Sequence, residues 1–417
     1  MARITILDGK RIILGVTGSI AVYKAVDLAS KLNQAGAVVD VVMTDAALRF
    51  VTPLTFQAVT GRAVYTGMWE PPAGEGLPTH IAHVGLAEAA DLLVIAPATA
   101  DCLARLAQGR ADDLISVTAL AARCPIVVAP AMDGGMYEHP ATQANVEVLR
   151  ARGVEVIEPE VGRFASGLTG RGRLPETPAL IGHIRRALGR SGPLAGRRVI
   201  VSAGATREPL DPVRYITNHS SGRQGHAIAQ AALDAGADVT LVTMARDLPA
   251  PVGAERVDVG SALELLAAIE SRIDAASPDV LVMSAAVADF RPASTADRKI
   301  KKPDDPDQGM TLELARNPDI LIQVKGLRQK LGRPLVVVGF AAETDDLIAS
   351  AASKLERKGL DLIVANDVSA GDAGFRAETN RVILLDRRGE RVDVDLTTKE
   401  RVAEIVIDRV TALLPGD

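Results

Sequence analysis

Short turns and polar residues that follow apolar runs are the clearest candidates for chemistry in this sequence. In the N-terminal half, the turn Thr17-Gly-Ser-Ile20 joins a β-branched run to a helical pattern. Backbone amides at such a turn suit a single phosphate group. The spacing of Gly15 and Gly18 differs from the Gly-x-Gly-x-x-Gly pattern of dinucleotide-binding proteins, and no Walker A pattern occurs. The turn therefore indicates either a phosphate site or a tight turn with nothing bound.

A second set of polar residues follows other apolar runs. The set comprises Thr44-Asp45, Pro97-Ala-Thr-Ala-Asp101, Pro130-Ala-Met-Asp133, Asp289 and Glu343. Because the carboxyl ends of parallel strands share one edge of a sheet, where ligands of open α/β folds bind, these side chains are candidates for binding sites. His83 precedes the third apolar run and could act as a base, the alternative being an ordinary histidine at the edge of the core.

In the C-terminal half the corresponding turn is replaced by a longer polar segment, residues 206–225. Such a segment at the carboxyl end of a strand is typical of a ligand-binding loop. The basic cluster Arg298-Lys-Ile-Lys-Lys302 could neutralise phosphate groups or form a solvated loop. Lys354 and Lys358 are four residues apart in a helical pattern, so they share one helix face.

The elements that must position these residues occur twice along the chain. Each half opens with a basic pair, a β-branched run and a glycine-containing turn, from about Gly9 and again from about Gly196. Helical patterns at residues 21–34 and 224–234 both end in Ala-Gly-Ala, and glycine is a usual helix stop. The later strands are expected at residues 38–44, 92–96 and 125–130, and at residues 239–243, 280–284 and 334–340.

This alternation predicts an α/β fold with two Rossmann-like domains, each a parallel sheet flanked by helices. Residues 189–196 are rich in glycine and proline and indicate a linker, so the expected domains are residues 1–190 and 191–417. A shared architecture does not require a shared function. An NAD(P)-dependent oxidoreductase with two such domains is one alternative, although the dinucleotide glycine pattern is missing.

The composition disfavours several classes of protein. The chain has 417 residues, a formal net charge of −5 and 3% aromatic residues, which argues against a general nucleic-acid-binding protein. No apolar stretch approaches the ~18 residues of a membrane span. No signal-peptide pattern opens the chain, and Cys102 and Cys124 are its only cysteines, so we expect a cytoplasmic protein without a membrane partner.

Several motifs together resemble known enzyme families. The N-terminal half resembles the flavin-dependent cysteine decarboxylases in Gly15-Val-Thr-Gly-Ser-Ile-Ala-Val-Tyr-Lys24, Ala96-Pro-Ala-Thr-Ala-Asp101, Ala111-Asp-Asp-Leu114, Ala129-Pro-Ala-Met132 and His139-Pro-Ala-Thr142. The C-terminal half resembles the phosphopantothenate–cysteine ligases in Thr206-Arg-Glu-Pro-Leu-Asp-Pro-Val-Arg-Tyr215, Asn218-His-Ser-Ser-Gly222, Ala285-Ala-Val-Ala-Asp289, Lys299-Ile-Lys-Lys302, Asn317-Pro-Asp319, Gly339-Phe-Ala-Ala-Glu343 and Ala365-Asn-Asp-Val368. In this order the halves resemble the bifunctional enzymes of coenzyme A biosynthesis, which join 4′-phosphopantothenate to cysteine and decarboxylate the product to 4′-phosphopantetheine.

The resemblance implies that the N-terminal half binds FMN and uses it to oxidise the substrate thiol before CO₂ is lost. The FMN-binding residues are then Gly18, Ser19, Ile20, Thr44, Ala98, Thr99, Ala100 and Asp101. His83 matches the family's catalytic base, and His80 is the weaker candidate for that role.

Two positions depart from the family pattern. Asp133 stands where an asparagine usually binds the leaving carboxylate, and Ser166 stands where a cysteine usually donates a proton. An ionised Asp133 would repel the substrate carboxylate, whereas a protonated Asp133 could donate a hydrogen bond to it and later supply the proton. We therefore expect decarboxylation to survive with Asp133, or water relayed by Ser166, as donor. The alternatives are arrest at an oxidised ene-thiol, or an inactive half that serves assembly.

For the C-terminal half the resemblance implies CTP as co-substrate and Mg²⁺, with an acyl cytidylate from which the cysteine amine displaces CMP. The nucleotide-binding residues are then Met283, Ser284, Ala285, Asp289, Lys299, Asn317, Pro318, Asp319, Phe340, Lys354 and Lys358. Lys299 would also be catalytic by neutralising the phosphates, and Asn218 would handle the acyl cytidylate. The resemblance further implies a homo-oligomer, from a trimer to a dodecamer.

Overall fold

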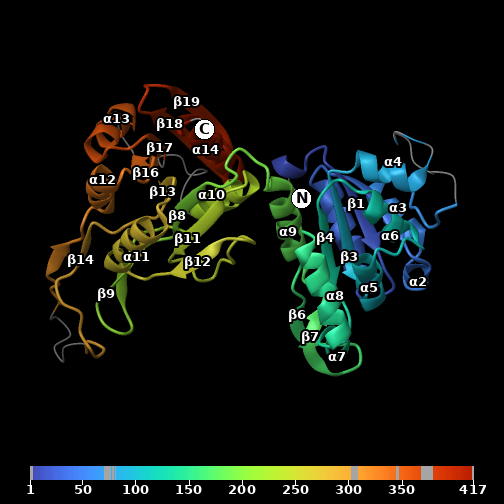
Figure 1. The fold of residues 1–417 in the computed structure, drawn as a ribbon. Coiled ribbons are helices and arrows are strands. Elements are labelled where there is room, and N and C mark those ends of the chain that lie inside the picture. Colours follow the sequence, from blue (N-terminus) through green and yellow to red (C-terminus); the bar gives the residue numbers. More distant parts are fainter. Residues whose placement is uncertain are drawn as a thin grey trace. The chain divides into compact units, whose positions relative to one another are not determined.

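The computed structural model describes residues 3–69, 77, 79, 81–301, 309–343, 347–367 and 379–415. The chain forms two compact units, Met1–Gly189 and Arg190–Asp417 (Figure 1). Each unit has its own hydrophobic core on both faces of a sheet. None of the helices in the described ranges is long and apolar enough to cross a lipid bilayer.

The first unit is built on a five-stranded sheet with a separate two-stranded hairpin. Its strands are β1 (Arg11–Val16), β2 (Val38–Met43), β3 (Leu92–Ala98), β4 (Ile126–Pro130), β5 (Glu155–Val156), β6 (Glu160–Arg163) and β7 (Thr169–Arg173). Its helices are the 3₁₀ turn η1 (Thr5–Leu7) and α1 (Val22–Gln34), α2 (Asp45–Leu48), α3 (Pro53–Thr60), α4 (Ala82–Ala89), α5 (Ala100–Gln108), α6 (Leu114–Ala121), α7 (Gly134–Tyr137), α8 (Pro140–Ala151) and α9 (Thr177–Gly189).

The five strands run parallel in the order β2-β1-β3-β4-β5, with helices on both faces of the sheet. Alternation along β1 explains the two layers, since successive side chains point to opposite faces. Ile12 and Leu14 pack in the core under α1, α3 and α9. Ile13 packs in the core under α4, α5, α6 and α8. Burial of both faces explains the near-continuous apolar strands.

The second unit is built on an eight-stranded sheet. Its strands are β8 (Arg198–Ala203), β9 (Arg207–Pro209), β10 (Tyr215–Thr217), β11 (Asp238–Thr243), β12 (Glu255–Asp258), β13 (Val280–Met283), β14 (Phe290–Pro292), β15 (Leu314–Arg316), β16 (Val336–Glu343), β17 (Leu362–Asp367), β18 (Thr379–Asp386) and β19 (Arg391–Thr398). Its helices are α10 (Arg223–Asp234), α11 (Ala262–Ala276), α12 (Ile320–Leu331), α13 (Leu347–Lys358) and α14 (Lys399–Leu413).

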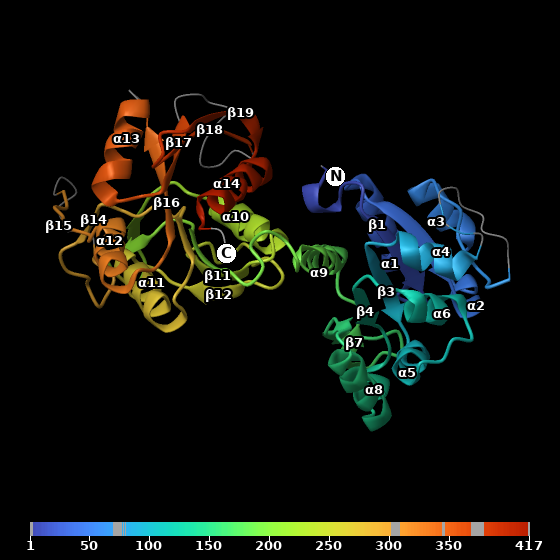
Figure 2. The ribbon, with the colours of Figure 1, turned by 45° about the horizontal axis from the view of Figure 1, so that its top comes forward.

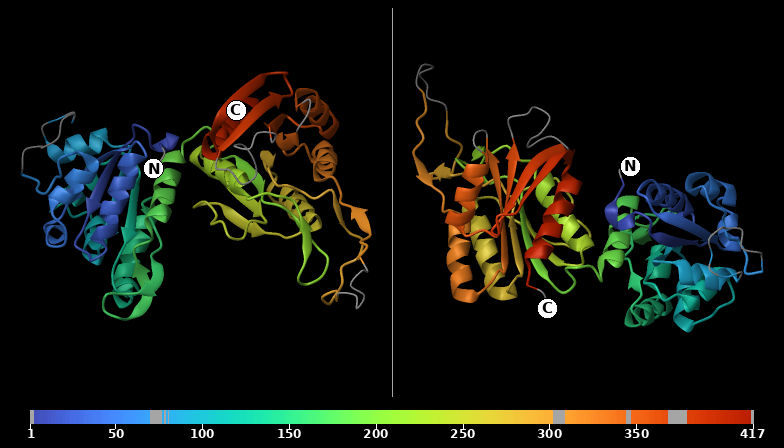
Figure 3. Two further views of the ribbon diagram at one scale, coloured as in Figure 1. Left: turned by 180° about the vertical axis from the view of Figure 1, so that it is seen from behind. Right: turned by 90° about the horizontal axis from the view of Figure 1, so that it is seen from above.

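The large sheet has the order β12-β11-β8-β13-β16-β17-β18-β19. Helices α10 and α14 cover one face, and α11, α12 and α13 cover the other (Figure 2). The predicted fold class, α/β with parallel sheets flanked by helices, is confirmed. Two features were not expected, namely the antiparallel strands β18 and β19 at one edge and a hairpin, β9 with β10, inside the polar segment 206–225. Strands β14 and β15 form an arm that extends from the sheet (Figure 3).

Candidate active sites

The N-terminal site lies where the chain changes direction across the first sheet. Strand β1 pairs with β2 on one side and β3 on the other, so the connections from β1 and β3 leave in opposite directions. Ligands of open α/β sheets bind at such a switch point. Thr17 joins the two strand ends, because its Oγ1 donates to the Pro97 carbonyl at 2.7 Å and accepts from the Thr99 amide at 3.0 Å. The turn 17–20 and the segment 98–101 are thereby brought together.

A first cavity of about 840 Å³ opens beside this junction. It is lined by Thr17, Gly18, Met43 to Ala46, Thr66 to Trp69, Thr99 to Cys102, Arg105, Asp112 to Ile115 and Met136. Thr44 and Thr99 accept hydrogen bonds from the Ala47 and Cys102 amides, so each caps the helix that begins after it. Gly18 is needed for packing, because a Cβ there would lie 2.4 Å from the Ala46 Cβ.

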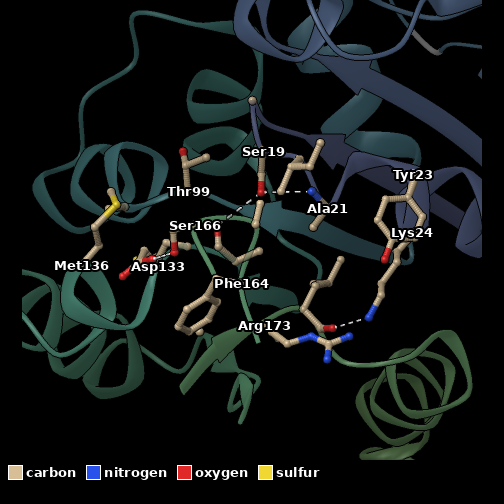
Figure 4. Close-up of a pocket in the computed structure, with 18 of the residues that line it drawn as sticks. Ser19, Ala21, Tyr23, Lys24, Thr99, Asp133, Met136, Phe164, Ser166 and Arg173 are labelled. Atoms are coloured by element: carbon tan, nitrogen blue, oxygen red, sulfur yellow. Dashed lines mark hydrogen bonds between the residues drawn. The ribbon is translucent and has the colours of Figure 1, made fainter. Parts of the chain in front are cut away.

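A second cavity of about 500 Å³ adjoins the first, with Gly18, Thr99, Ala100 and Met136 lining both. It is further lined by Ser19, Ile20, Ala21, Tyr23, Lys24, Ala131 to Asp133, Arg163 to Ser166 and Gly172 to Leu174 (Figure 4). The turn after β4 and the hairpin of β6 and β7 therefore form adjoining parts of its lining.

Asp133 and Ser166 are in direct contact in the lining of this second cavity. The Ser166 hydroxyl donates to Asp133 Oδ2 at 2.7 Å (Figure 4). Asp133 Oδ1 accepts from the Gly135 amide at 3.3 Å, so the same carboxylate caps α7. The hairpin is held there by the Met132 amide, which donates to the Gly172 carbonyl at 3.0 Å. Asp133 is half-buried and Ser166 is exposed, so neither group is enclosed by this chain alone.

The charged groups around the two cavities are largely paired. Buried Lys24 donates to the Leu174 carbonyl at 2.8 Å and to Glu176 at 2.7 Å. Arg105 pairs with Asp101 at 2.9 Å, which ties α5 to its own first turn. Burial raises the pKa of the Cys102 thiol far above its usual value, and the negative charges nearby act in the same direction. Cys102 therefore stays a neutral thiol at physiological pH.

The structure places His83 on α4, half-buried, and the described residues that line the two cavities do not include it. Its role as a base thus remains a prediction that the geometry of this chain does not support directly. His80 lies outside the described residues.

The C-terminal site lies at the matching switch point of the second sheet, between β8 and β13. The chain segments that leave these two strands pair with each other. The Ala286 amide donates to the Gly204 carbonyl at 2.8 Å, and the Ala288 amide donates to Thr206 Oγ1 at 3.0 Å. This pairing fixes residues 285–288 at the carboxyl edge of the sheet.

A cavity of about 200 Å³, here called the nucleotide cavity, begins at this segment. It is lined by Met283, Ala285, Val287, Ala288, Asp289, Asn317 to Leu321, Phe340 and Lys358. Of the residues predicted to bind the nucleotide, only Ser284, Lys299 and Lys354 are missing from the described lining. Lys299 is exposed on the segment after β14, and Lys302 lies outside the described residues.

Two polar residues after β15 shape the nucleotide cavity. Asn317 Nδ2 donates to the Ala288 carbonyl at 2.8 Å, which holds the arm against the strand end. Asp319 caps α12 and also pairs with Lys358 from α13, with 3.0 Å between Nζ and Oδ2. The ion pair keeps a cation at the cavity, where phosphate oxygens could replace the carboxylate.

Asn218 lies beside the nucleotide cavity rather than in it. It lines a neighbouring cavity of about 340 Å³ together with Arg207, Tyr215 and Arg223. Its Nδ2 donates at 3.2 Å to the carbonyl of Val287, which lines the nucleotide cavity. The two cavities therefore meet at this hydrogen bond.

Each of the two units matches a known protein family. Residues 4–189 match the family model described as Flavoprotein, and residues 194–414 match that described as the DNA/pantothenate metabolism flavoprotein C-terminal domain. A coenzyme A biosynthesis bifunctional protein CoaBC of Vibrio cholerae is 46% identical over 401 residues, covering 96% of this chain and 98% of the relative. The chain belongs to this bifunctional CoaBC family. The CoaBC protein of Bacillus subtilis is 45% identical over 410 residues, with 98% of both chains covered.

A solved C-terminal domain of a CoaBC protein is also similar, at 34% identity and a TM-score of 0.44 over 54% of this chain and 98% of that domain. The two bifunctional relatives, which match over nearly the full length, confirm the family that the motifs predicted. Within this chain, the flavoprotein half contains Asp133 and Ser166, and the other half contains the nucleotide cavity.

Several residues at the sites were not singled out from the sequence. They are Tyr23, Lys24, Phe164 and Arg173, which line the second cavity, and Arg207 and Arg223, which line the cavity of Asn218. Tyr23 and Lys24 end the first motif that resembles the flavin-dependent cysteine decarboxylases, and Arg173 ends a glycine-rich stretch of the hairpin. Their positions within these motifs were the only sequence signal that could have marked them as site residues.

Proposed function

We propose that the chain catalyses two consecutive steps of coenzyme A biosynthesis. The C-terminal unit joins 4′-phosphopantothenate to cysteine with CTP, and the N-terminal unit decarboxylates the resulting 4′-phosphopantothenoylcysteine to 4′-phosphopantetheine. The observation that carries the proposal is the match to bifunctional relatives across both units. The two polar sites at the carboxyl edges of the sheets support it.

In the ligation, the carboxylate of 4′-phosphopantothenate attacks CTP and pyrophosphate leaves, and the cysteine amine then displaces CMP from the acyl cytidylate. Lys358, already held at the nucleotide cavity, would bind phosphate oxygens, and half-buried Phe340 would pack against the base. Lys299 would neutralise the charge that accumulates as pyrophosphate leaves. Mg²⁺ would bind mainly through the nucleotide phosphates.

The first cavity fits FMN by size and by chemistry. Its volume of about 840 Å³ lies in the range of cofactor sites, and Met43, Met68 and Ile115 give it apolar walls. In the turn 17–20 the Thr17 and Ser19 amides donate to the carbonyls of Pro97 and Thr17, so a phosphate would bind through the amides of Gly18 and Ile20. When bound, FMN would supply the reversible two-electron chemistry that this decarboxylation requires.

The chain's own residues would handle the carboxylate and the proton. Asp133 would face the substrate carboxylate, and in its protonated form it would donate a hydrogen bond to it. Ser166, on the hairpin, would hold the Asp133 carboxyl in place and relay a proton to the product. The hairpin itself would exclude water from the second cavity.

A second candidate function is ligation followed by arrest at an oxidised ene-thiol, which the serine at position 166 favours because a hydroxyl is a poor acid. One experiment tests both candidate functions, the complete two-step reaction and the reaction that stops at the ene-thiol. With CTP, 4′-phosphopantothenate and cysteine supplied to the full chain, pyrophosphate release should require 4′-phosphopantothenate, and CO₂ release should require all three. Absence of pyrophosphate release would refute the ligase, and its presence without CO₂ would refute the decarboxylase. CO₂ release is common to full turnover and to the arrested reaction, so the mass of the product separates these two.

A further inference from the structure

Asp211 is a buried carboxylate in the turn between β9 and β10, and it lines none of the cavities described above. It is 3% exposed. Its Oδ1 accepts from the Val213 amide at 2.8 Å and from the Arg214 amide at 2.9 Å. These bonds close the turn on itself, as an aspartate commonly does at the start of a turn. One oxygen of the carboxylate therefore organises the hairpin.

The other oxygen binds a distant segment of the chain. Asp211 Oδ2 accepts from Arg214 Nε at 3.0 Å and from the Ile300 amide at 3.1 Å. The Arg214 guanidinium in turn donates to the Ile300 carbonyl at 2.9 Å. Both polar groups of Ile300 are thus bound by one ion pair, and Ile300 lies between Lys299 and Lys301.

Further contacts dock the same segment on the hairpin. The Ala296 amide donates to the Leu210 carbonyl at 3.0 Å, and Thr295 Oγ1 donates to the Pro209 carbonyl at 3.2 Å. Residues 295–300 therefore lie alongside residues 209–214 and are hydrogen-bonded to them. The Lys299 side chain remains exposed while the backbone beside it is held.

The electrostatics require Asp211 to be ionised. Hydrogen bonds from the Arg214 side chain hold the pKa of the Asp211 carboxyl well below its usual range, against the opposing effect of burial. A carboxylate that accepts from both a guanidinium and backbone amides forms stronger hydrogen bonds than a neutral amide would. Replacement by asparagine therefore weakens the hold on Ile300 without changing the size of the side chain.

We propose that Asp211 is a positioning residue for the first half-reaction of the ligase, in which it fixes Ile300 and so places Lys299 to neutralise the phosphates of CTP while the substrate carboxylate attacks. The inference rests on the proposed function of Lys299 in that half-reaction. If Asp211 only stabilised the hairpin, its loss would affect both half-reactions, because Arg207, Tyr215 and Asn218 belong to the same hairpin and its end.

The test separates the two half-reactions in the full-length protein. For Asp211→Asn, the kcat of pyrophosphate release from CTP and 4′-phosphopantothenate should fall at least about tenfold. Aminolysis of supplied 4′-phosphopantothenoyl cytidylate by cysteine should stay within about twofold of the wild-type rate, because that step does not need pyrophosphate to leave.

Asp386→Asn is the matched control. Asp386 is also buried, accepts from the Arg388 and Glu390 amides of the following turn and pairs with Arg409, but it lies at the end of β18. It should leave the ratio of the two half-reactions unchanged. Ile300→Pro provides a second approach if Asp211→Asn does not fold, because it removes the amide that Asp211 binds, although it also fixes φ at residue 300 and restricts the backbone of Lys299. Ile300→Ala keeps that amide, so a loss specific to the first half-reaction should appear in the proline variant and not in the alanine variant.

The outcomes are distinct. An unchanged pyrophosphate release in Asp211→Asn, or an equal loss in both half-reactions, overturns the inference while the role of Lys299 stands. If Lys299→Gln itself releases pyrophosphate at the wild-type rate, the proposed role of Lys299 is wrong and the inference falls with it.

Discussion

The Ser166 hydroxyl donates a hydrogen bond to Asp133 at 2.7 Å, although the two residues are 33 positions apart and lie on different elements. The contact depends on the hairpin of β6 and β7 lying against the turn after β4. Both residues depart from the sequence pattern that the decarboxylase half resembles. Because the two residues are in direct contact, the simplest interpretation is that they share one function.

The first prediction concerns this pair. Asp133→Ala should abolish decarboxylation of 4′-phosphopantothenoylcysteine, by at least about a hundredfold in kcat, because the proposed acid and its hydrogen bond to the substrate carboxylate are removed. Ser166→Cys should retain or raise turnover, since a thiol can both hold Asp133 and donate a proton. Product formation is followed by mass spectrometry. Full activity of Asp133→Ala would exclude Asp133 as the donor.

The second prediction concerns the seating of the hairpin. A Cβ on Gly172 would lie 2.2 Å from the Met132 carbonyl oxygen, so Gly172→Ala must shift the hairpin away from Asp133. Decarboxylation should fall at least about tenfold while ligation is unaffected. Gly135→Ala is the control, because its Cβ would have only Asp133 Oδ1 near it, at 3.9 Å. Equal activity of the two variants would show that the position of the hairpin is unimportant.

The third prediction concerns the flavin. The purified full-length protein should be yellow and release FMN on denaturation. In Gly18→Ala the new methyl group would clash with Ala46 and displace the turn. Because the turn amides would then no longer be placed to bind the FMN phosphate, the flavin content should fall several-fold. Pyrophosphate release by the other unit is the internal control. Full flavin content in Gly18→Ala would separate the turn from flavin binding.

The fourth prediction divides the ligase reaction between two residues. Lys299→Gln should reduce pyrophosphate release at least about a hundredfold, since charge neutralisation at the phosphates is lost. Asn218→Ala should permit pyrophosphate release and allow the acyl cytidylate to accumulate, because Asn218 contacts Val287 from outside the nucleotide cavity. Quenched-flow sampling with detection of the cytidylate measures both. Equal loss of both steps in Asn218→Ala would contradict this division.

Much of the fold could be predicted from the sequence because its signals are local. The helical pattern at residues 21–34 became α1, Val22–Gln34, and the apolar run at 92–96 became β3, Leu92–Ala98. A buried parallel strand appears as a short apolar run, and a helix end appears as a glycine directly after the helical pattern, so both can be recognised within a few consecutive residues. Most of the nucleotide-binding residues, which the resemblance to the ligases implied, also line one cavity.

Features that depend on distant contacts could not be predicted in this way. The polar segment 206–225 gave no sign of β9 and β10, whose pairing is stabilised by the buried turn at Asp211. The contact of Ser166 with Asp133 requires the close approach of Gly172 to Met132, which no local pattern records. His83 was expected near the flavin, but the described lining of both cavities does not include it.

The most direct test of the account is the mass of the products formed by the full-length protein from CTP, 4′-phosphopantothenate and cysteine. We expect CMP, pyrophosphate, CO₂ and 4′-phosphopantetheine, with 4′-phosphopantothenoylcysteine as a transient intermediate. A final product two hydrogens lighter than 4′-phosphopantetheine would contradict the proposed proton donation by Asp133 and Ser166. Accumulation of 4′-phosphopantothenoylcysteine without CO₂ would contradict the decarboxylase itself.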